Sequence, residues 1–175
     1  MTPHVILVGL PGAGKTSVGR MLSRQLNCPL LDFDEELERR TGLSVPEIFR
    51  IHGEAHFRRL ELDLTRELAA SEGAILAPGG GWVTIPGAMA LLRPPARMIY
   101  LRVAPEVAIL RMGAARSRRP LLDAPQPLEV LRQLAKQREP AYLEADHVIS
   151  TDHIDVEALA AQIARLVDPS SGSRV

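Results

Sequence analysis

Eight consecutive residues near the amino terminus have the composition of a phosphate-binding loop. Gly9 to Thr16, written GLPGAGKT, fit the pattern G-x-x-x-x-G-K-[ST]. Glycines let the backbone fold so that its N–H groups point at phosphate oxygens, and the helix that follows adds the positive end of its dipole. In such a loop Lys15 reaches the β- and γ-phosphates and Thr16 ligates Mg²⁺. The pattern therefore predicts a site for a nucleoside triphosphate.

Two acidic residues, Asp32 and Asp34, follow a short apolar segment at residues 30–31. Two positions apart on an extended chain, they would share one face at the end of a strand. One could support the Mg²⁺ shell and the other could contact an acceptor hydroxyl, because phosphoryl transfer needs neutralised charge and a positioned acceptor. In isolation, a solvated loop or a helix cap explains such a pair as well. Beside a phosphate-binding loop we favour the functional interpretation.

Arginines and glycines further along the chain could bind an anionic acceptor. Arg58 and Glu61 are three residues apart on a predicted helix, so the carboxylate can orient the guanidinium toward a substrate carboxylate. Gly79, Gly80 and Gly81 follow a predicted strand, where a glycine run permits close backbone approach to a ligand. The alternatives are an ordinary surface ion pair and a flexible turn.

The apolar pattern predicts a scaffold that would bring these residues together. Helical patterns alternate with short apolar segments, which implies a parallel sheet covered on both faces. We therefore expect an α/β fold, a three-layer α/β/α arrangement with a five-stranded parallel sheet of the P-loop kinase type. The predicted strands are 5–8, 30–31, 75–77, 98–101 and 148–149. The predicted helices are 18–26, 44–53, 54–70, 106–113, 128–145 and 156–167.

The chain is long enough for one domain, which we assign to residues 1–168. Residues 112–127 are rich in arginine, proline and small side chains without a clear period, so we expect a mobile lid there. Residues 169–175 are predicted to form a disordered tail. No N-K-x-D segment is present, which argues against a GTPase and favours a small-molecule kinase.

The composition excludes several classes of partner. Basic and acidic residues balance at 21 each, so no net field would draw the chain to nucleic acid or to a membrane surface. Cys28 is the only cysteine, which rules out an intrachain disulfide. No apolar run approaches the length of a membrane span. We predict a cytoplasmic protein and, because no coiled-coil seam or second domain is visible, a monomer.

Taken in order, the motifs resemble those of the shikimate kinase family from Gly9 to about Asp152. The resemblance rests on GAGKT at 12–16, DFD at 32–34, RTG at 40–42 with IF at 48–49, GExxFRxxE at 53–61, GGG at 79–81, RPLL at 119–122 and REPxY at 138–142. It implies an ATP-dependent kinase that phosphorylates the 3-hydroxyl of shikimate, with one Mg²⁺ per subunit.

The resemblance also implies a role for each matching residue. Arg58 and Arg138 would hold the shikimate carboxylate with Glu61 in support, Asp34 would be the candidate base, and Arg119 would close with the lid. The implied nucleotide-binding residues are Gly12, Ala13, Gly14, Lys15, Thr16, Ser17, Arg111 and Arg119. The implied acceptor-binding residues are Asp34, Arg58, Gly79, Gly80, Gly81 and Arg138. The implied catalytic residues are Lys15, Asp34 and Arg119, and the implied metal-supporting residues are Thr16 and Asp32, the latter through water.

Several residues keep two interpretations. In relatives an arginine just upstream of the position of Arg119 stacks on adenine; Arg111 is the better match, with Arg116 as the alternative. Phe49 and Phe57 would face the acceptor ring or pack in the core. Trp82 lies outside the family pattern, so it would either pack or alter the fit of the acceptor.

Two other functions compete with a shikimate kinase. One is another small-metabolite kinase such as a gluconate kinase, although Asp34, Arg58 and Arg138 argue against it. The other is a noncatalytic, ligand-sensing module of the same fold, which should have lost Lys15, Asp34 or Arg119. His52 and His56 do not match H-E-x-x-H, so we expect surface or packing histidines there rather than a metal site.

Overall fold

The computed structural model describes residues 3–167, and the predicted tail at 169–175 lies outside this range. Five parallel strands form one sheet in the order β2-β3-β1-β4-β5. The strands are β1 (Val5–Val8), β2 (Leu30–Asp32), β3 (Ile75–Ala77), β4 (Arg97–Arg102) and β5 (His147–Ser150). The predicted α/β class and the five-stranded parallel sheet are confirmed, and every predicted strand lies within an observed one.

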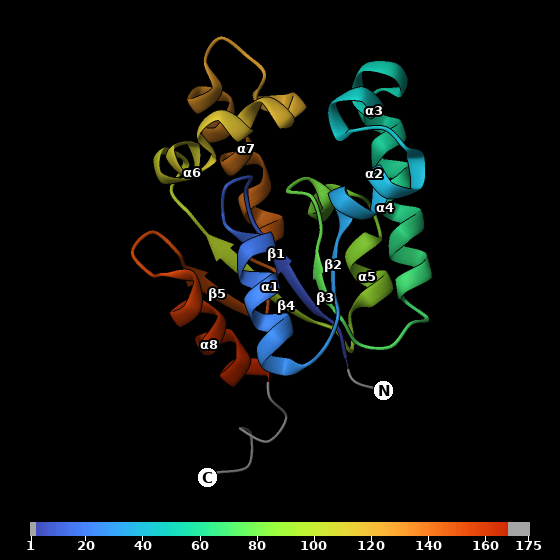
Figure 1. The fold of residues 1–175 in the computed structure, drawn as a ribbon, viewed down its shortest axis with the longest axis vertical. Coiled ribbons are helices and arrows are strands. Elements are labelled where there is room, and N and C mark those ends of the chain that lie inside the picture. Colours follow the sequence, from blue (N-terminus) through green and yellow to red (C-terminus); the bar gives the residue numbers. More distant parts are fainter. Residues whose placement is uncertain (1–2, 168–175) are drawn as a thin grey trace.

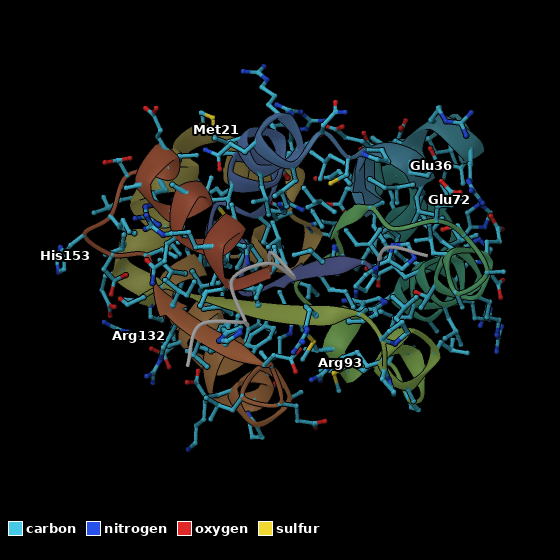
Figure 2. All side chains as sticks on the ribbon, turned by 90° about the horizontal axis from the view of Figure 1, so that it is seen from below. Met21, Glu36, Glu72, Arg93, Arg132 and His153 are labelled. Carbon is cyan, nitrogen blue, oxygen red and sulfur yellow. The ribbon has the colours of Figure 1, made fainter. Side chains whose placement is uncertain are left out.

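Helices cover both faces of the sheet, which explains why its central strands are continuously apolar. Every residue of β1 and β3 is buried, as expected for strands with helices on each side. In Figure 2, α1 (Lys15–Leu26) and α8 (Val156–Val167) lie above the sheet, and α5 (Ala88–Leu92) and α7 (Pro127–Tyr142) lie below it.

Two groups of helices rise beyond the carboxyl ends of the strands (Figure 1). One group is α2 (Phe33–Thr41), α3 (Val45–His52) and α4 (Glu54–Leu68). The other contains α6 (Pro105–Met112) and the start of α7, with the 3₁₀ helices η2 (Gly113–Arg118) and η3 (Pro120–Leu122) between them. The chain crosses from β1 to β2 on one side and later places β4 on the other side of β1. Ligands of open α/β sheets bind at such a switch point.

The predicted start of α3 is confirmed in detail. Ser44 caps the helix: its hydroxyl accepts from the Glu47 N–H at 3.4 Å, and the Glu47 carboxylate accepts from the Ser44 N–H at 2.8 Å. Such a reciprocal pair satisfies two backbone donors at once. It fixes where α3 begins and therefore how this group of helices stands over the sheet.

Our expectation that Asp32 and Asp34 share an extended segment is wrong. Strand β2 ends at Asp32, whose side chain accepts a hydrogen bond from the Glu35 N–H at 3.2 Å and so caps α2. Asp34 therefore lies in the first helical turn. Aspartate is a preferred cap residue and acidic side chains favour the positive end of a helix. The same preference moves Asp34 off the strand.

Three other segments differ from the sequence prediction. The predicted lid, 112–127, includes η2 and η3 rather than being a continuous loop. The short helix α5 and a 3₁₀ turn, η1 (Trp82–Thr84), were not predicted at all.

None of the helices within residues 3–167 is both long and apolar enough to cross a membrane.

A buried histidine joins the start of β1 to the neighbouring connections. The ring of His4 is 7% exposed, accepts from the Ala74 N–H at Nδ1 (3.0 Å) and lies 2.9 Å from the Leu68 carbonyl oxygen at Nε2. The ring must therefore be neutral, with its proton on Nε2, to satisfy both partners. This residue links the end of α4 to the segment that enters β3.

We expect His4→Leu to lower the free energy of unfolding by about 1–3 kcal/mol, because it leaves the buried N–H of Ala74 without its acceptor, whereas the Leu68 carbonyl keeps the N–H and hydroxyl of Ser71 as donors. Urea denaturation measures the change. His153→Leu is the matched control, because His153 is exposed. Equal midpoints for the two variants would show that the two hydrogen bonds of His4 do not stabilise the fold.

Candidate active site

The glycine-rich loop joins the buried strand β1 to α1 at the switch point of the sheet. Gly9 and Gly12 have φ angles of 151° and 82°, values that residues other than glycine rarely adopt. A Cβ atom on Gly12 would lie 2.5 Å from the carbonyl oxygen of Ala108, and one on Gly9 would lie 2.5 Å from that of Leu101. Both conformation and space therefore require glycine at these two positions.

Lys15 lies at the end of this loop and points back across it. Its ammonium donates hydrogen bonds to the carbonyl oxygens of Gly9 (2.8 Å) and Leu10 (3.1 Å). Burial lowers the pKa of Lys15 to about 7, and the positive charge of Arg119 acts in the same direction. An anionic ligand would favour the charged form of this lysine. The ammonium is therefore suited to phosphate.

Two oxygen ligands suitable for Mg²⁺ lie side by side next to the loop. The Thr16 hydroxyl donates to the Asp32 carboxylate at 2.5 Å, and both residues line the same cavity. Mg²⁺ prefers oxygen ligands and is usually held by one or two protein groups together with phosphates and water. In residues 3–167 no cluster of three or more histidine, cysteine or acidic side chains could hold a metal. The pair therefore fits a nucleotide-bound Mg²⁺ rather than an all-protein metal site.

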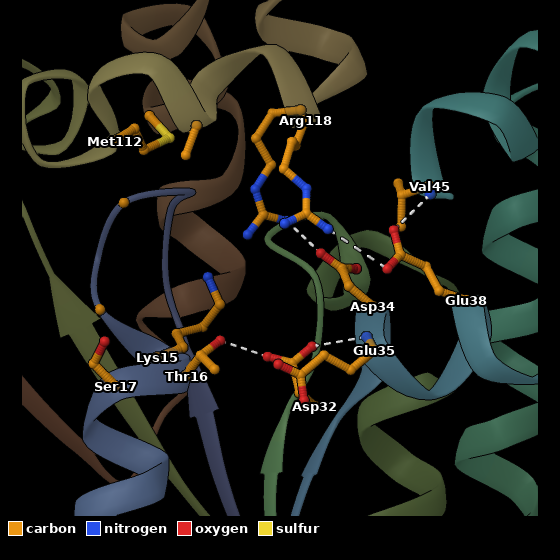
Figure 3. A pocket seen from close by; sticks show the side chains of 14 residues that line it. Lys15, Thr16, Ser17, Asp32, Asp34, Glu35, Glu38, Val45, Met112 and Arg118 are labelled. Carbon is orange, nitrogen blue, oxygen red and sulfur yellow. Dashed lines mark hydrogen bonds and ion pairs between the residues drawn. The ribbon is translucent and has the colours of Figure 1, made fainter. Parts of the chain in front are cut away.

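A cavity of about 300 Å³ lies beside the loop, between α1, α2 and the predicted lid (Figure 3). Asp34 forms an ion pair with Arg119 across it, and Glu38 lies 3.7 Å from Arg118. The lid thus reaches α2 through two arginine–carboxylate contacts. The side chains drawn in Figure 3 also include Lys15, Thr16, Ser17, Asp32 and Glu35.

A second, smaller cavity of about 50 Å³ brings the predicted acceptor residues together. Asp34 and Arg119 line this cavity as well as the larger one, so the two cavities meet at the ion pair between them. The smaller cavity, which we call the acceptor cavity, is lined by Pro11, Asp34, Val45, Phe49, Phe57, Arg58, Gly79, Gly80, Gly81, Arg119, Pro120, Leu121, Leu122, Leu134 and Arg138.

Two guanidinium groups face the acceptor cavity from different helices. Arg58, on α4, pairs with Glu61 at 2.6 Å and with Glu54 at 2.8 Å, as the spacing predicted for Glu61. Arg138, on α7, is only 6% exposed and forms no ion pair in the described part of the chain. A buried cation without a countercharge is unfavourable. Arg138 therefore favours an anionic ligand in this cavity.

The glycine run 79–81 leaves room for three functional side chains. A Cβ atom on the first glycine would lie 2.7 Å from Oε1 of Glu61, and one on the second would lie 3.1 Å from Nη1 of Arg138. On the third it would overlap the guanidinium of Arg58. We expected glycine here for close approach to a ligand; the neighbouring side chains require the same space.

Glu61 is fully buried behind Arg58. Its Oε2 accepts the hydrogen bond from Arg58, whereas its Oε1 has no hydrogen-bond partner. Desolvation raises the pKa of Glu61 to about 7, and the positive charge of Arg58 opposes this shift. The carboxyl group that orients Arg58 therefore titrates near neutral pH.

A third cavity of about 510 Å³ lies on the other side of the loop, between Gly12, Ala13 and the end of β5. Arg111 lines it and donates to the Thr151 hydroxyl at 3.0 Å. Arg116 is exposed and lines none of the three cavities. This arrangement supports Arg111 over Arg116 as the arginine on the side of the nucleotide base.

The aromatic residues divide between the cavity and the core. Phe49 and Phe57 both line the acceptor cavity, with ring centroids 5.0 Å apart. Trp82 is fully buried and donates its ring N–H to the Thr65 hydroxyl at 2.9 Å, which favours the packing interpretation. The rings of His52 and His56 contact each other at a tilt, with centroids 4.7 Å apart, and belong to no metal cluster in the described chain.

Glu38 and Arg118 are among the residues of the 300 Å³ cavity that sequence reasoning missed. Both line it and contact each other. The signal for Arg118 was its place directly before Arg119 in the predicted lid. Glu38 gave no signal, because nothing in the sequence shows that α2 faces the lid.

Comparisons with known proteins find relatives in sequence and in fold. The family model for shikimate kinase matches residues 11–168. A shikimate kinase from Thiobacillus denitrificans is 42% identical over 170 residues, 97% of this chain and 92% of that protein. The solved shikimate kinase from Acinetobacter baumannii in complex with shikimate has a TM-score of 0.93 and 36% identity, covering 99% of this chain and 97% of that one. A gluconokinase from Sinorhizobium meliloti, at 16% identity and a TM-score of 0.57 over 95% of this chain and 94% of that one, shares the fold alone.

The buried carboxyl group of Glu61 predicts a pH-dependent stability. Because its pKa is raised from 4.5 to about 7 in the folded state, the folded chain binds more protons between these values and loses stability as the pH rises through them. Glu61→Gln removes this titration. The stability of the wild type relative to Glu61→Gln should therefore fall by about 3 kcal/mol between pH 4.5 and 7.

Urea denaturation of both proteins across this range measures the difference. Glu54→Gln is the matched control, because Glu54 pairs with the same arginine but has a side chain that is 47% exposed. A Glu61→Gln variant that follows the wild type in parallel from pH 4.5 to 7 would contradict the assignment.

Proposed function

The chain belongs to the shikimate kinase family, and on that premise we propose that it transfers the γ-phosphoryl group of ATP to the 3-hydroxyl of shikimate. One observation carries the proposal. The cavity that holds Arg58, Arg138 and the glycine run meets the phosphate cavity at Asp34 and Arg119. A carboxylated acceptor bound by the two arginines would thus lie next to the terminal phosphate of a nucleotide bound at the loop.

Positive charge at the phosphate cavity would stabilise the transferring group. Lys15 lies at the loop, and Arg119 reaches the cavity from the lid. Charge on the equatorial oxygens of the phosphoryl group is spread during transfer, so cations held in place beforehand lower the barrier. Thr16 and Asp32 would hold Mg²⁺, which supplies further neutralisation of phosphate charge. The resemblance further suggests that Arg111 lies near the base of the nucleotide.

Asp34 is our candidate for the residue that orients the acceptor hydroxyl and accepts its proton. It lies in the first turn of α2 and lines both cavities. Its ion pair with Arg119 places a carboxylate and a guanidinium together where the hydroxyl and the γ-phosphate would meet. Closure of residues 112–127 over the two ligands would exclude water, which would otherwise compete as acceptor.

All of these residues belong to one chain, so we propose that a single copy carries the complete site. Lys15, Asp34 and Arg119 are all present at the cavities, which argues against a noncatalytic module. A monomeric state and a cytoplasmic location stay predictions from the sequence.

A coupled assay of ADP release tests the acceptor. We expect turnover with shikimate and ATP, little turnover with gluconate, and loss of activity when a chelator removes Mg²⁺. Equal turnover of gluconate and shikimate would refute the proposed acceptor. Activity that survives complete removal of divalent cations would refute the proposed role of Thr16 and Asp32.

We expect Asp34→Asn to lower kcat by about 10²–10³-fold, because the amide cannot accept the hydroxyl proton, while ATP binding survives. Steady-state kinetics and equilibrium nucleotide binding separate the two effects. Glu36→Gln is the control on the same helix, since Glu36 pairs with Arg39 and Arg40 rather than lining the cavity. Near-wild-type turnover of Asp34→Asn would show that another group takes the proton.

A further inference from the structure

Tyr142 is a fully buried residue that the proposed mechanism does not use. It lies on α7, four residues and about one helical turn after Arg138, so both side chains leave the helix on the same side. Its hydroxyl donates a hydrogen bond to the carbonyl oxygen of Gly80 at 2.6 Å. This bond joins α7 to the glycine run that follows β3.

Arg138 lies near the same hydroxyl. Burial raises the pKa of Tyr142, and the positive charge of Arg138 opposes this rise. Arg138 in turn lies against Gly80, where a Cβ atom would be 3.1 Å from Nη1. Three groups therefore meet at one point: a backbone carbonyl, a phenol and the arginine that faces the acceptor cavity.

The direction of the Gly80 carbonyl matters for an anionic ligand. Gly80 and Arg138 line the acceptor cavity, whereas Tyr142 does not. Because the carbonyl oxygen points at Tyr142, its partial negative charge is directed at the phenol. A rotated peptide would turn that charge toward a ligand carboxylate and repel it. Glycine has no side chain to resist such a rotation.

We propose that Tyr142 is a positioning residue for the carboxylate of the acceptor. Its hydroxyl fixes the peptide at Gly80 and the guanidinium of Arg138 in the arrangement that binds the anion. The inference rests on the proposed function for the identity of the acceptor. It goes beyond that function in assigning the preorganisation of the acceptor cavity to one phenolic hydroxyl.

The chain contains an internal control for this hydroxyl. Tyr100, on β4, stacks on Tyr142 with ring centroids 4.8 Å apart and is equally buried. Its hydroxyl donates to Glu139 at 2.9 Å instead of to the glycine run. Removing either hydroxyl leaves the ring pair intact. Only the Tyr142 hydroxyl, however, is bonded to a residue that lines the acceptor cavity, Gly80.

The test compares Tyr142→Phe and Tyr100→Phe with the wild type in two measurements. The first is the Kd for shikimate, followed by the fluorescence of Trp82, the only tryptophan in the sequence and the residue directly after the glycine run. The second is the set of KM and kcat values for shikimate and ATP. We expect Tyr142→Phe to raise the Kd and KM for shikimate about tenfold with little change for ATP. Tyr100→Phe should stay near the wild type in both.

A purely structural role would give a different result. The positioning role is overturned if Tyr142→Phe weakens the binding of ATP and of shikimate to the same extent. It is also overturned if Tyr100→Phe weakens shikimate binding as much as Tyr142→Phe does. Thermal melting of both variants shows whether either has lost stability.

Failure of the proposed function is recognised separately. A wild type that binds shikimate but releases no ADP would refute phosphoryl transfer, and the Kd comparison would still decide the role of Tyr142. A wild type that binds no shikimate at all would overturn the inference together with the acceptor.

Discussion

The confinement of positive charge at the carboxyl edge of the sheet is the constraint on which the rest of this structure depends. Lys15, Arg58, Arg119 and Arg138 all face the two adjoining cavities. Arg119 pairs with Asp34, Arg58 pairs with Glu61 and Glu54, and Lys15 donates to carbonyl oxygens of the loop. Arg138 is the buried cation for which residues 3–167 provide no ion pair. Cations held in a poorly solvated site favour anionic ligands, because a phosphate or carboxylate restores the missing balance.

The fold holds these charges in place by bringing them from segments far apart in the sequence. The loop at the switch point supplies Lys15, α4 supplies Arg58, and α7 supplies Arg138. Arg119, which precedes α7 in the predicted lid, forms an ion pair with Asp34 of α2. No single element carries a complete site, so the geometry depends on how the two groups of helices stand on the sheet.

The sequence predicted several local features correctly. Continuous apolar segments predict strands buried on both faces, and Ser44 with Glu47 predicts the start of α3. Asp32 with Glu35 three residues later is also a local capping signal, but the functional interpretation of the acidic pair was preferred to the helix cap. Local patterns could not choose between Arg111 and Arg116, because that choice depends on a cavity formed with the end of β5. Glu38 gave no signal because its partner is distant in sequence, and the motif that contains Tyr142 did not show its bond to Gly80 for the same reason.

Glycine is often required both by a backbone conformation and by a lack of space for a side chain, but in the run 79–81 only the second reason applies. None of its three residues has a positive φ, so the local backbone would accept alanine without strain. What excludes a methyl group is the side chains of other elements, which occupy the space that it would fill. A chain altered there would keep its strand and its turn yet lose the shape of its binding surface. Glycine at these positions therefore serves the shape of the binding surface rather than the path of the backbone.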